Sequence, residues 1–274
     1  LSHLARLHTL RGDSSTAEEL YRAALSARDS VLGPEDPLVA VSLSNLGSFL
    51  RLQGRYAEAL PLYLRALAIF EMSDVPNDSR VAGANRSLGL VYQSLGRFEE
   101  ANSAYQRALE IYEAIGSDSL ETARVLNDLA TISYRLGDYD AAEELTRRAL
   151  AIRQDALGPT SPLVAESVNN LGEILRAQGR YWEAEAAHLR ALEIREGLRE
   201  PDAVEVAQSL NNLGLVRLAL GRHTEAAVLL ERALASWEAE LGPNHPEVAT
   251  ALNNLASVMS ALGRTDEAIE LFGR

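Results

Sequence analysis

The residues of this sequence that could do chemistry are arginine, asparagine, histidine and paired carboxylates, because cysteine and lysine are both absent. The absence of cysteine excludes disulfides, thiolate metal sites and a cysteine nucleophile. Among the five histidines, only His3 and His8 are spaced as two ligands of one metal could be. We therefore expect each histidine to be an isolated surface residue, with no metal site and no cofactor.

Acidic pairs recur at one place in a repeated pattern, at Glu18-Glu19, Glu99-Glu100 and Glu143-Glu144. A catalytic pair of carboxylates would be unique to one place, so these pairs indicate a solvated outer face. The sequence also has no glycine-rich phosphate loop, no nucleophile elbow and no triad pattern. We therefore predict that the protein is not an enzyme.

Recognition by arginine and asparagine is the chemistry that remains. Asparagine occurs in adjacent pairs within segments that otherwise look helical, as in Asn169-Asn170, Asn211-Asn212 and Asn253-Asn254. Asparagine is a poor helix-interior residue, so an interaction outside the helix must compensate for it. Its amide both donates and accepts hydrogen bonds, which suits it to bridge helices or to bind the backbone of a peptide.

The elements that must position these side chains repeat along the whole chain. Seven glycines are separated by 41 or 42 residues, and each has a leucine eight residues before it, the repeat leucine. The glycines are Gly12, Gly54, Gly96, Gly137, Gly179, Gly221 and Gly263. The repeat leucines are Leu4, Leu46, Leu88, Leu129, Leu171, Leu213 and Leu255. A fixed period of this length is typical of repeat architectures.

Each unit is predicted to hold two helices joined by a turn, and no segment has a strand pattern. Ser161-Pro162 is a helix cap followed by proline at the first helical position, after which apolar residues recur at helical spacing. Gly179 fits the left-handed residue that ends a helix. In another unit, Asp118 and Glu121 are spaced as a capping box.

One helix pair cannot bury its apolar face alone, so the units are predicted to stack into a single domain over residues 1–274. Their approximate bounds are 1–32, 33–74, 75–116, 117–157, 158–199, 200–241 and 242–274. The first unit lacks most of its first helix, and the last stops within its second helix. We expect both ends to continue, or to be covered, in the native protein.

A helix–turn–helix unit with Leu-Gly or Leu-Ala, a helix-ending glycine, Tyr or Phe, and then Ala-Leu resembles a tetratricopeptide repeat (TPR). With LGPNHPEVATALNNLA and GRYAEALPLYLRALAI, the 42-residue unit is most similar to the kinesin-light-chain type. The third unit, NDSRVAGANRSLGLVYQ, departs most, because it lacks Leu-Gly-Pro and the Asn pair. The resemblance implies an all-α fold, a right-handed superhelical solenoid of about seven repeats with the first and last truncated, that serves as a protein–protein interaction scaffold.

The resemblance also implies that one face of each first helix lines a concave groove for partner peptides. We place the repeat leucine at 0° on a helical wheel and advance 100° per residue. The positions five before, two before, two after and five after it then fall between about 140° and 220°, opposite the core. The first asparagine of each pair lies on this stripe and is expected to face the groove. The second lies on the flank, where we expect it to bridge adjacent first helices. A solvated polar face inherited by duplication is the alternative for the first set.

In the units after the first, and with the position six after the leucine included, the stripe carries five arginines and two glutamates, a charge of +3 in a chain of net charge −13. These residues are Arg51, Arg86, Arg124, Arg135, Arg176, Glu166 and Glu173. A basic trough would attract an acidic segment or a C-terminal carboxylate, although seven charges could also scatter this way by chance. The predicted partner-binding residues are Arg51, Arg86, Arg124, Asn127, Thr131, Tyr134, Asn169, Glu173, Arg176, Asn211 and Asn253. The lysine and asparagine clamp of chaperone-binding members has no match.

Two rival functions stay open. The chain could be a regulatory or sensor region of a larger bacterial signalling protein or caspase-like protease, or a self-assembly module acting through its terminal repeats. The net charge of −13 argues against nucleic acid and anionic membrane as partners. No apolar run approaches 18 residues, and we expect a cytoplasmic protein. All 26 basic residues are Arg, which favours a high-GC bacterium as the source. Trp182 is expected to pack between repeats.

Overall fold

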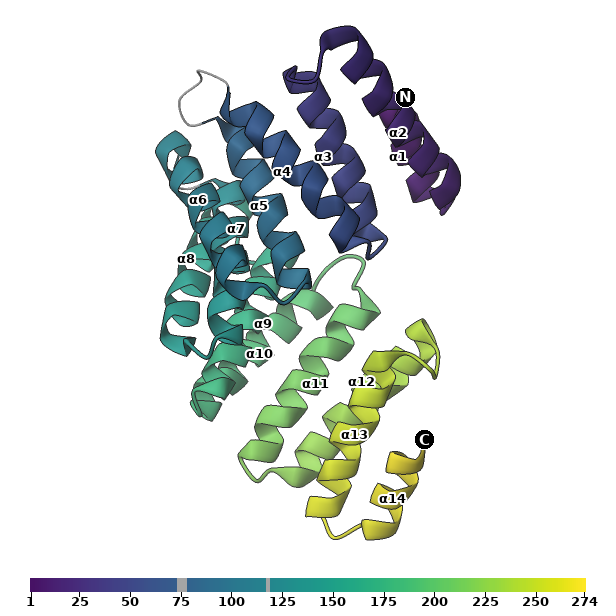
Figure 1. The fold of residues 1–274 in the computed structure, drawn as a ribbon. Helices are drawn as coiled ribbons and strands as arrows, with labels where there is room; N and C mark the ends of the chain where they lie inside the picture. The colour runs from purple at the N-terminus through teal and green to yellow at the C-terminus, as the bar shows by residue number, and fades with distance from the viewer. Residues whose placement is uncertain (73–77, 117–118) are drawn as a thin grey trace. The chain divides into compact units, whose positions relative to one another are not determined.

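The computed structural model describes residues 1–72, 78–116 and 119–274, and within these ranges the chain forms fourteen α-helices and no strand (Figure 1). The helices are α1 (Ser2–Leu10), α2 (Ser14–Leu32), α3 (Pro37–Leu52), α4 (Tyr56–Glu71), α5 (Ser79–Ser94), α6 (Phe98–Gly116), α7 (Leu120–Arg135), α8 (Tyr139–Leu157), α9 (Pro162–Ala177), α10 (Tyr181–Glu196), α11 (Ala203–Ala219), α12 (His223–Leu241), α13 (Pro246–Ala261) and α14 (Thr265–Gly273). Each predicted repeat interval holds two of them, a first helix with an odd number and a second helix with an even one.

Most of the helices begin at capping residues and end close to glycines with positive φ. The side chain of Ser161 accepts a hydrogen bond from the backbone N–H of Val164, with Pro162 at the first helical position. Gly179 has a φ of 77°, and all seven glycines of the repeat have positive φ, as a helix-ending turn requires. Asp118, half of the predicted capping box, lies outside the described residues. Ser119 is the N-cap of α7 and accepts a hydrogen bond from the backbone N–H of Thr122.

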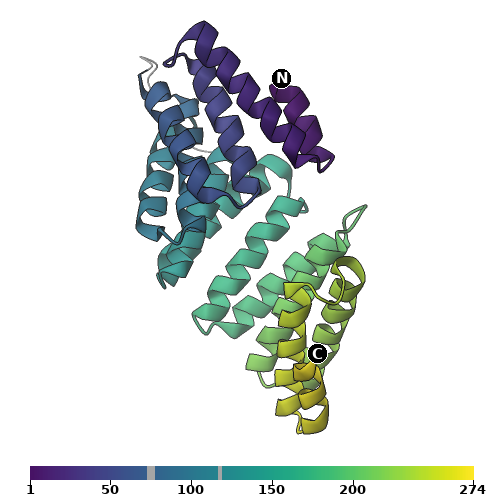
Figure 2. The ribbon, with the colours of Figure 1, turned by 45° about the vertical axis from the view of Figure 1, so that its right-hand side comes forward.

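The chain divides into two compact units, residues 1–136 and residues 137–274. In the first unit, α3 packs against α4, α4 against α5, and α5 against α6; in the second, α9 to α14 pack in the same serial order. Figure 2 shows the same arrangement from a second direction, with helices of each pair side by side. The predicted all-helical solenoid of repeated helix pairs is thereby confirmed. Within the described residues, no helix is long and apolar enough to cross a membrane.

The core is built from small and medium apolar residues. Alanines such as Ala66, Ala108, Ala149, Ala191 and Ala233, from the repeated Ala-Leu step, are fully buried. Small residues let neighbouring helices approach closely, which explains how a chain with 5% aromatic residues still packs its helices tightly. This packing fixes which side of each first helix stays accessible.

Candidate binding face

In residues 1–136 the accessible side of the first helices is a surface of α3, α5 and α7, which we call the basic face. Arg51 on α3 and Arg86 on α5 are half-buried, and Arg124 on α7 is exposed. Arg135, at the end of α7, is also exposed. Helix α5 contacts both α3 and α7, so the three first helices form one continuous surface within this unit.

Arg86 is tied to the next repeat. Its Nε donates to the Asp128 carboxylate at 2.6 Å, and the two side chains are 28% and 14% exposed. Arg86 stands two residues before its repeat leucine, and Asp128 stands directly before the next one. The contact therefore joins α5 to α7, and it uses one edge of the Arg86 guanidinium.

Two tyrosine hydroxyls, of the buried Tyr105 and the half-buried Tyr112, are influenced by the arginines of the basic face. Burial and the Asp128 carboxylate raise the pKa of the Tyr105 hydroxyl above its usual value, while Arg86 and Arg51 act to lower this pKa. Burial and Glu121 likewise raise the pKa of Tyr112, while Arg86 and Arg124 act to lower it. Arg86 thus acts electrostatically on both hydroxyls, together with Arg51 on that of Tyr105 and Arg124 on that of Tyr112. The three arginines Arg51, Arg86 and Arg124 form a row across α3, α5 and α7.

Carboxylates of the protein neutralise only part of the positive charge of this row. Arg124 donates to Glu121 at 2.6 Å in an exposed pair on its own helix, and such a pair contributes little and exchanges readily. Neither Arg51 nor Arg135 forms an ion pair with any residue of the described ranges. The basic face therefore carries four arginines and two paired carboxylates.

The other predicted residues of this unit lie along α7. Thr131 is half-buried, and its hydroxyl donates to the backbone carbonyl of Asn127 at 3.0 Å. Asn127 and Tyr134 are also half-buried. Their positions on the accessible side of α7 agree with the predicted stripe.

In residues 137–274 the paired asparagines form a ladder between repeats. Asn212 donates to Asn169 at 3.2 Å, and Asn254 donates to Asn211 at 2.9 Å. Each contact, which we call a rung, joins the residue two before one repeat leucine to the residue directly before the next. The Arg86–Asp128 pair occupies the corresponding positions in residues 1–136. The expectation that the second asparagine bridges adjacent first helices is confirmed for Asn212 and Asn254.

The ladder corrects the expected exposure of the first asparagines. Asn169 is 3% exposed and Asn211 is 5% exposed, because the following first helix covers them and their amides are used in rungs. They do not face an open groove. Asn253 occupies the same repeat position on α13 and is exposed.

Glu173 and Arg176 also pair with each other, at 2.8 Å, on α9. Beneath them lies His188 of α10, whose side chain is fully buried. Its Nδ1 is 3.1 Å from the Asn169 side-chain oxygen, and its Nε2 is 3.7 Å from Glu173 Oε1. Burial lowers the pKa of His188 to about 4, so the ring is neutral at pH 7. The expectation that every histidine lies at the surface is wrong for this residue.

The space for His188 is made by a glycine on the neighbouring first helix. A Cβ added at Gly172 would lie 2.6 Å from the His188 ring. The same arrangement places Tyr63 against Gly47 and Tyr105 against Gly89. These rings stand seventeen residues after the repeat leucine, and the hydroxyl of Tyr105 donates to Gln93 at 2.9 Å. Aligning the repeats at this position, a step the sequence allowed, would have revealed His188 as a core residue.

The two tryptophans differ from each other. Trp182 is 69% exposed, so the expectation that it packs between repeats is wrong. It stands one residue after the Tyr181 that opens α10, where its side chain points away from the core. Trp237 is buried instead, and its Nε1 donates to the Val204 carbonyl at 3.2 Å.

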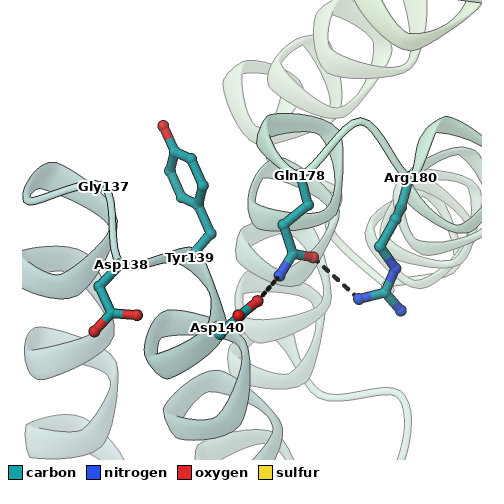
Figure 3. Close-up of a pocket in the computed structure, with 6 residues that line it drawn as sticks. All are labelled: Gly137, Asp138, Tyr139, Asp140, Gln178 and Arg180. Carbon is teal, nitrogen blue, oxygen red and sulfur yellow. Dashed lines mark hydrogen bonds between the residues drawn. The ribbon is translucent and has the colours of Figure 1, made fainter.

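The pocket of about 410 Å³ in Figure 3 lies at the turns that precede α8 and α10. Gln178 donates to Asp140 at 2.9 Å and accepts from Arg180 at 3.0 Å. Arg180 also pairs with Glu143 and Glu183, each at 2.6 Å. The polar groups here are occupied by one another, which makes this a structural junction between repeats. Within the described ranges, no group of three His, Cys, Asp or Glu could hold a metal ion.

Comparison with known proteins gives the family. The model of the tetratricopeptide repeat matches residues 1–72, 80–155, 129–197 and 205–274. We found no match among curated proteins.

Solved structures show the same fold. BtubC (BKLC) from P. vanneervenii is 28% identical, with a TM-score of 0.70 over 86% of this chain and 92% of that one. A Podosopora anserina protein described by kinesin light chain and TPR-like repeats is 26% identical, with a TM-score of 0.60 over 71% and 92%. The quorum sensor NprR from B. thuringiensis is 16% identical, with a TM-score of 0.68 over 99% and 84%, which shows the fold alone. Because the family model covers nearly the whole sequence, the chain belongs to the tetratricopeptide repeat family and is similar to proteins with kinesin-light-chain repeats.

Proposed function

We propose that this protein is an interaction scaffold that binds an extended, acidic segment of a partner protein on the basic face of α3, α5 and α7. The observation that carries the proposal is the row of Arg51, Arg86 and Arg124, in which Arg51 has no ion-pair partner within the described ranges. A guanidinium binds a carboxylate through paired hydrogen bonds, and a neighbouring row of them favours a ligand with several carboxylates.

The geometry of the row supports an extended ligand that crosses the helices. Packed helices lie about 8–10 Å apart, and an extended chain advances about 3.3 Å per residue. Three residues therefore span one helix spacing. Arg51 stands five residues after its repeat leucine, whereas Arg86 and Arg124 stand two and five residues before theirs, so the row crosses the helices obliquely. A segment with acidic residues about three to four positions apart would place one carboxylate near each arginine of the row.

The proposal concerns binding and not catalysis. His188 is buried and bonded to Asn169, and the exposed carboxylates of the second helices pair with arginines at the repeat period, as Glu183 does with Arg180. Within the ranges that the structure describes, we see no arrangement of nucleophile, base and orienting group that supports a reaction. Asn169 and Asn211, both buried in rungs, are not part of the proposed surface.

The test uses fluorescence anisotropy with a labelled peptide that carries Glu at every third position among Gly and Ser. The double variant Arg51→Glu, Arg124→Glu is expected to bind at least about tenfold more weakly, because two attractions become repulsions. Arg86 is kept, since replacing it would break the contact with Asp128. Helicity measured by circular dichroism is expected to be unchanged, because both replaced residues lie on the accessible side.

The matched control is the double variant Arg22→Glu, Arg107→Glu, which makes the same change in net charge. Arg22 and Arg107 lie on the second helices α2 and α6, with side chains 52% and 58% exposed. This variant is expected to bind within about threefold of the wild type. Equal weakening by both double variants would show that overall charge, and not the basic face, attracts the peptide.

A further inference from the structure

We propose that Asp128 determines which carboxylates of the acidic segment are recognised, an inference that rests on the proposed function. Asp128 is a carboxylate of the protein already placed on the middle arginine of the row. The wild-type face is then selective for ligands with acidic residues at the two outer positions, facing Arg51 and Arg124, and is indifferent to the charge of the residue between them.

Asp128 is held against Arg86, the middle arginine of the row. Its oxygen accepts from Arg86 Nε at 2.6 Å, and it is half as exposed as Arg86. Arg86 is therefore the more accessible partner of the pair, and a ligand approaching from solvent meets it more readily than Asp128. The adjacent negative charge cancels much of the attraction that Arg86 would otherwise exert on a central ligand carboxylate.

The chemistry of this contact differs from that of the other described rungs. The other described rungs, Asn169–Asn212 and Asn211–Asn254, are made by neutral amides and are nearly closed to solvent at the first residue. The contact between α5 and α7 replaces two amides by two charges and leaves Arg86 28% exposed. A neutral rung would hold the repeats together without any influence on the charge of a ligand.

Position 128 accommodates a neutral partner of Arg86. Asparagine stands at the equivalent place in Asn212 and Asn254, where its Nδ2 donates across the rung. Arg86 has only donors, so in Asp128→Asn the amide presents its oxygen to Arg86, which keeps the contact while the negative charge is gone. The variant therefore separates the structural contact from the electrostatic effect.

The experiment is a cycle of four affinities. The wild type and Asp128→Asn are each titrated with two peptides that carry Glu at both outer positions and either Gln or Glu at the centre. For the wild type, we expect the central Glu to change the affinity by less than about twofold. For Asp128→Asn, we expect it to strengthen binding by about tenfold, because Arg86 then keeps its full charge.

The charge control is Glu100→Gln, which removes one negative charge next to Arg97 at the start of α6, away from the basic face. It is expected to respond to the central Glu as the wild type does. A response of less than twofold in Asp128→Asn, with both peptides still bound and binding still lost in Arg51→Glu, Arg124→Glu, would overturn the inference and leave the proposed function standing. If neither protein binds either peptide, the proposed function fails and the inference fails with it.

Discussion

At the scale of single residues, His188 is a side chain whose charge the fold controls strongly. It takes the place that Tyr63 and Tyr105 take in other repeats, against a glycine of the preceding helix. The tyrosines carry a neutral hydroxyl at this place, whereas His188 can gain a proton in a site that disfavours charge. Charged groups that face it are Glu173 and Arg176 of α9 and Arg195 of its own helix.

The stability of the protein should therefore depend on the protonation of His188. The folded-state pKa of about 4 is below the unfolded value of 6.5, so the unfolded chain binds more protons between these values. The contribution of neutral His188 is complete above pH 6.5 and is lost as the pH falls toward 4, by roughly 3 kcal/mol in total. Urea denaturation at several pH values is expected to show a smaller loss over this window for His188→Tyr than for the wild type.

The control for this measurement is His3→Tyr, because His3 is exposed. Its stability should follow that of the wild type through the whole pH window. Parallel curves for His188→Tyr and the wild type would show that the ring is not protected from protonation in the folded protein.

At the scale of the helices, α8, α10 and α12 are each attached to the following first helix by one of two kinds of contact. Arg153 donates to Ser167 at 2.7 Å, and Arg195 donates to Ser209 at 2.6 Å. The corresponding positions in the next repeat hold Trp237 and Ala251, which lie in one apolar cluster. A serine accompanies the arginine and an alanine accompanies the aromatic ring, because each small residue must match the group that covers it.

This exchange predicts strong coupling between two positions. Ser209→Ala should lower the free energy of unfolding by about 2 kcal/mol, because the buried Arg195 loses an acceptor. The double variant Arg195→Trp, Ser209→Ala should recover more than half of this loss by reproducing the aromatic contact. Urea titrations of both variants and of Ser257→Ala, an exposed control, measure the effect. A double variant less stable than Ser209→Ala would contradict the proposed equivalence.

The sequence predicted these elements well because their signals are local. The period of the glycines, the Ser161-Pro162 cap and the repeat leucines placed the helices correctly. The sequence could not predict the burial of Asn169, because a helix wheel describes one helix and the covering residue comes from the next repeat. For the same reason, the sequence predicted Arg86 as a charge of the accessible stripe and did not reveal its partner Asp128, which lies 42 residues away.

At the scale of the whole molecule, stability is a sum over neighbouring repeats, since each helix pair contacts mainly the next one. Helix α9 has nine buried residues, whereas α1 and α14 have one each, Ala5 and Ala268. A helix with few buried contacts opens at low free-energy cost.

Hydrogen exchange read by mass spectrometry should therefore be uneven in this chain. Backbone amides of α1 and α14 are expected to exchange at least about a hundredfold faster than those of α9 at neutral pH. Bound acidic peptide should slow exchange in α3, α5 and α7, which carry the basic face, and leave α13 unchanged. Uniform exchange along the chain would mean that the repeats open together as one cooperative unit.

The residues at the rung positions also determine which repeats can be joined to one another. An Asn–Asn rung needs asparagine two residues before the leucine of one repeat and directly before the leucine of the next. Any two repeats that meet this condition can follow one another, so such repeats are exchangeable parts for engineering. Arg86 and Asp128 break this interchangeability, because their ion pair forms only where the repeat that carries the arginine is followed by the repeat that carries the aspartate. Arrays in which the order of these repeats is changed should keep the repeats of Arg86 and Asp128 adjacent. A second charged rung would be enough to dictate the order in which the repeats assemble.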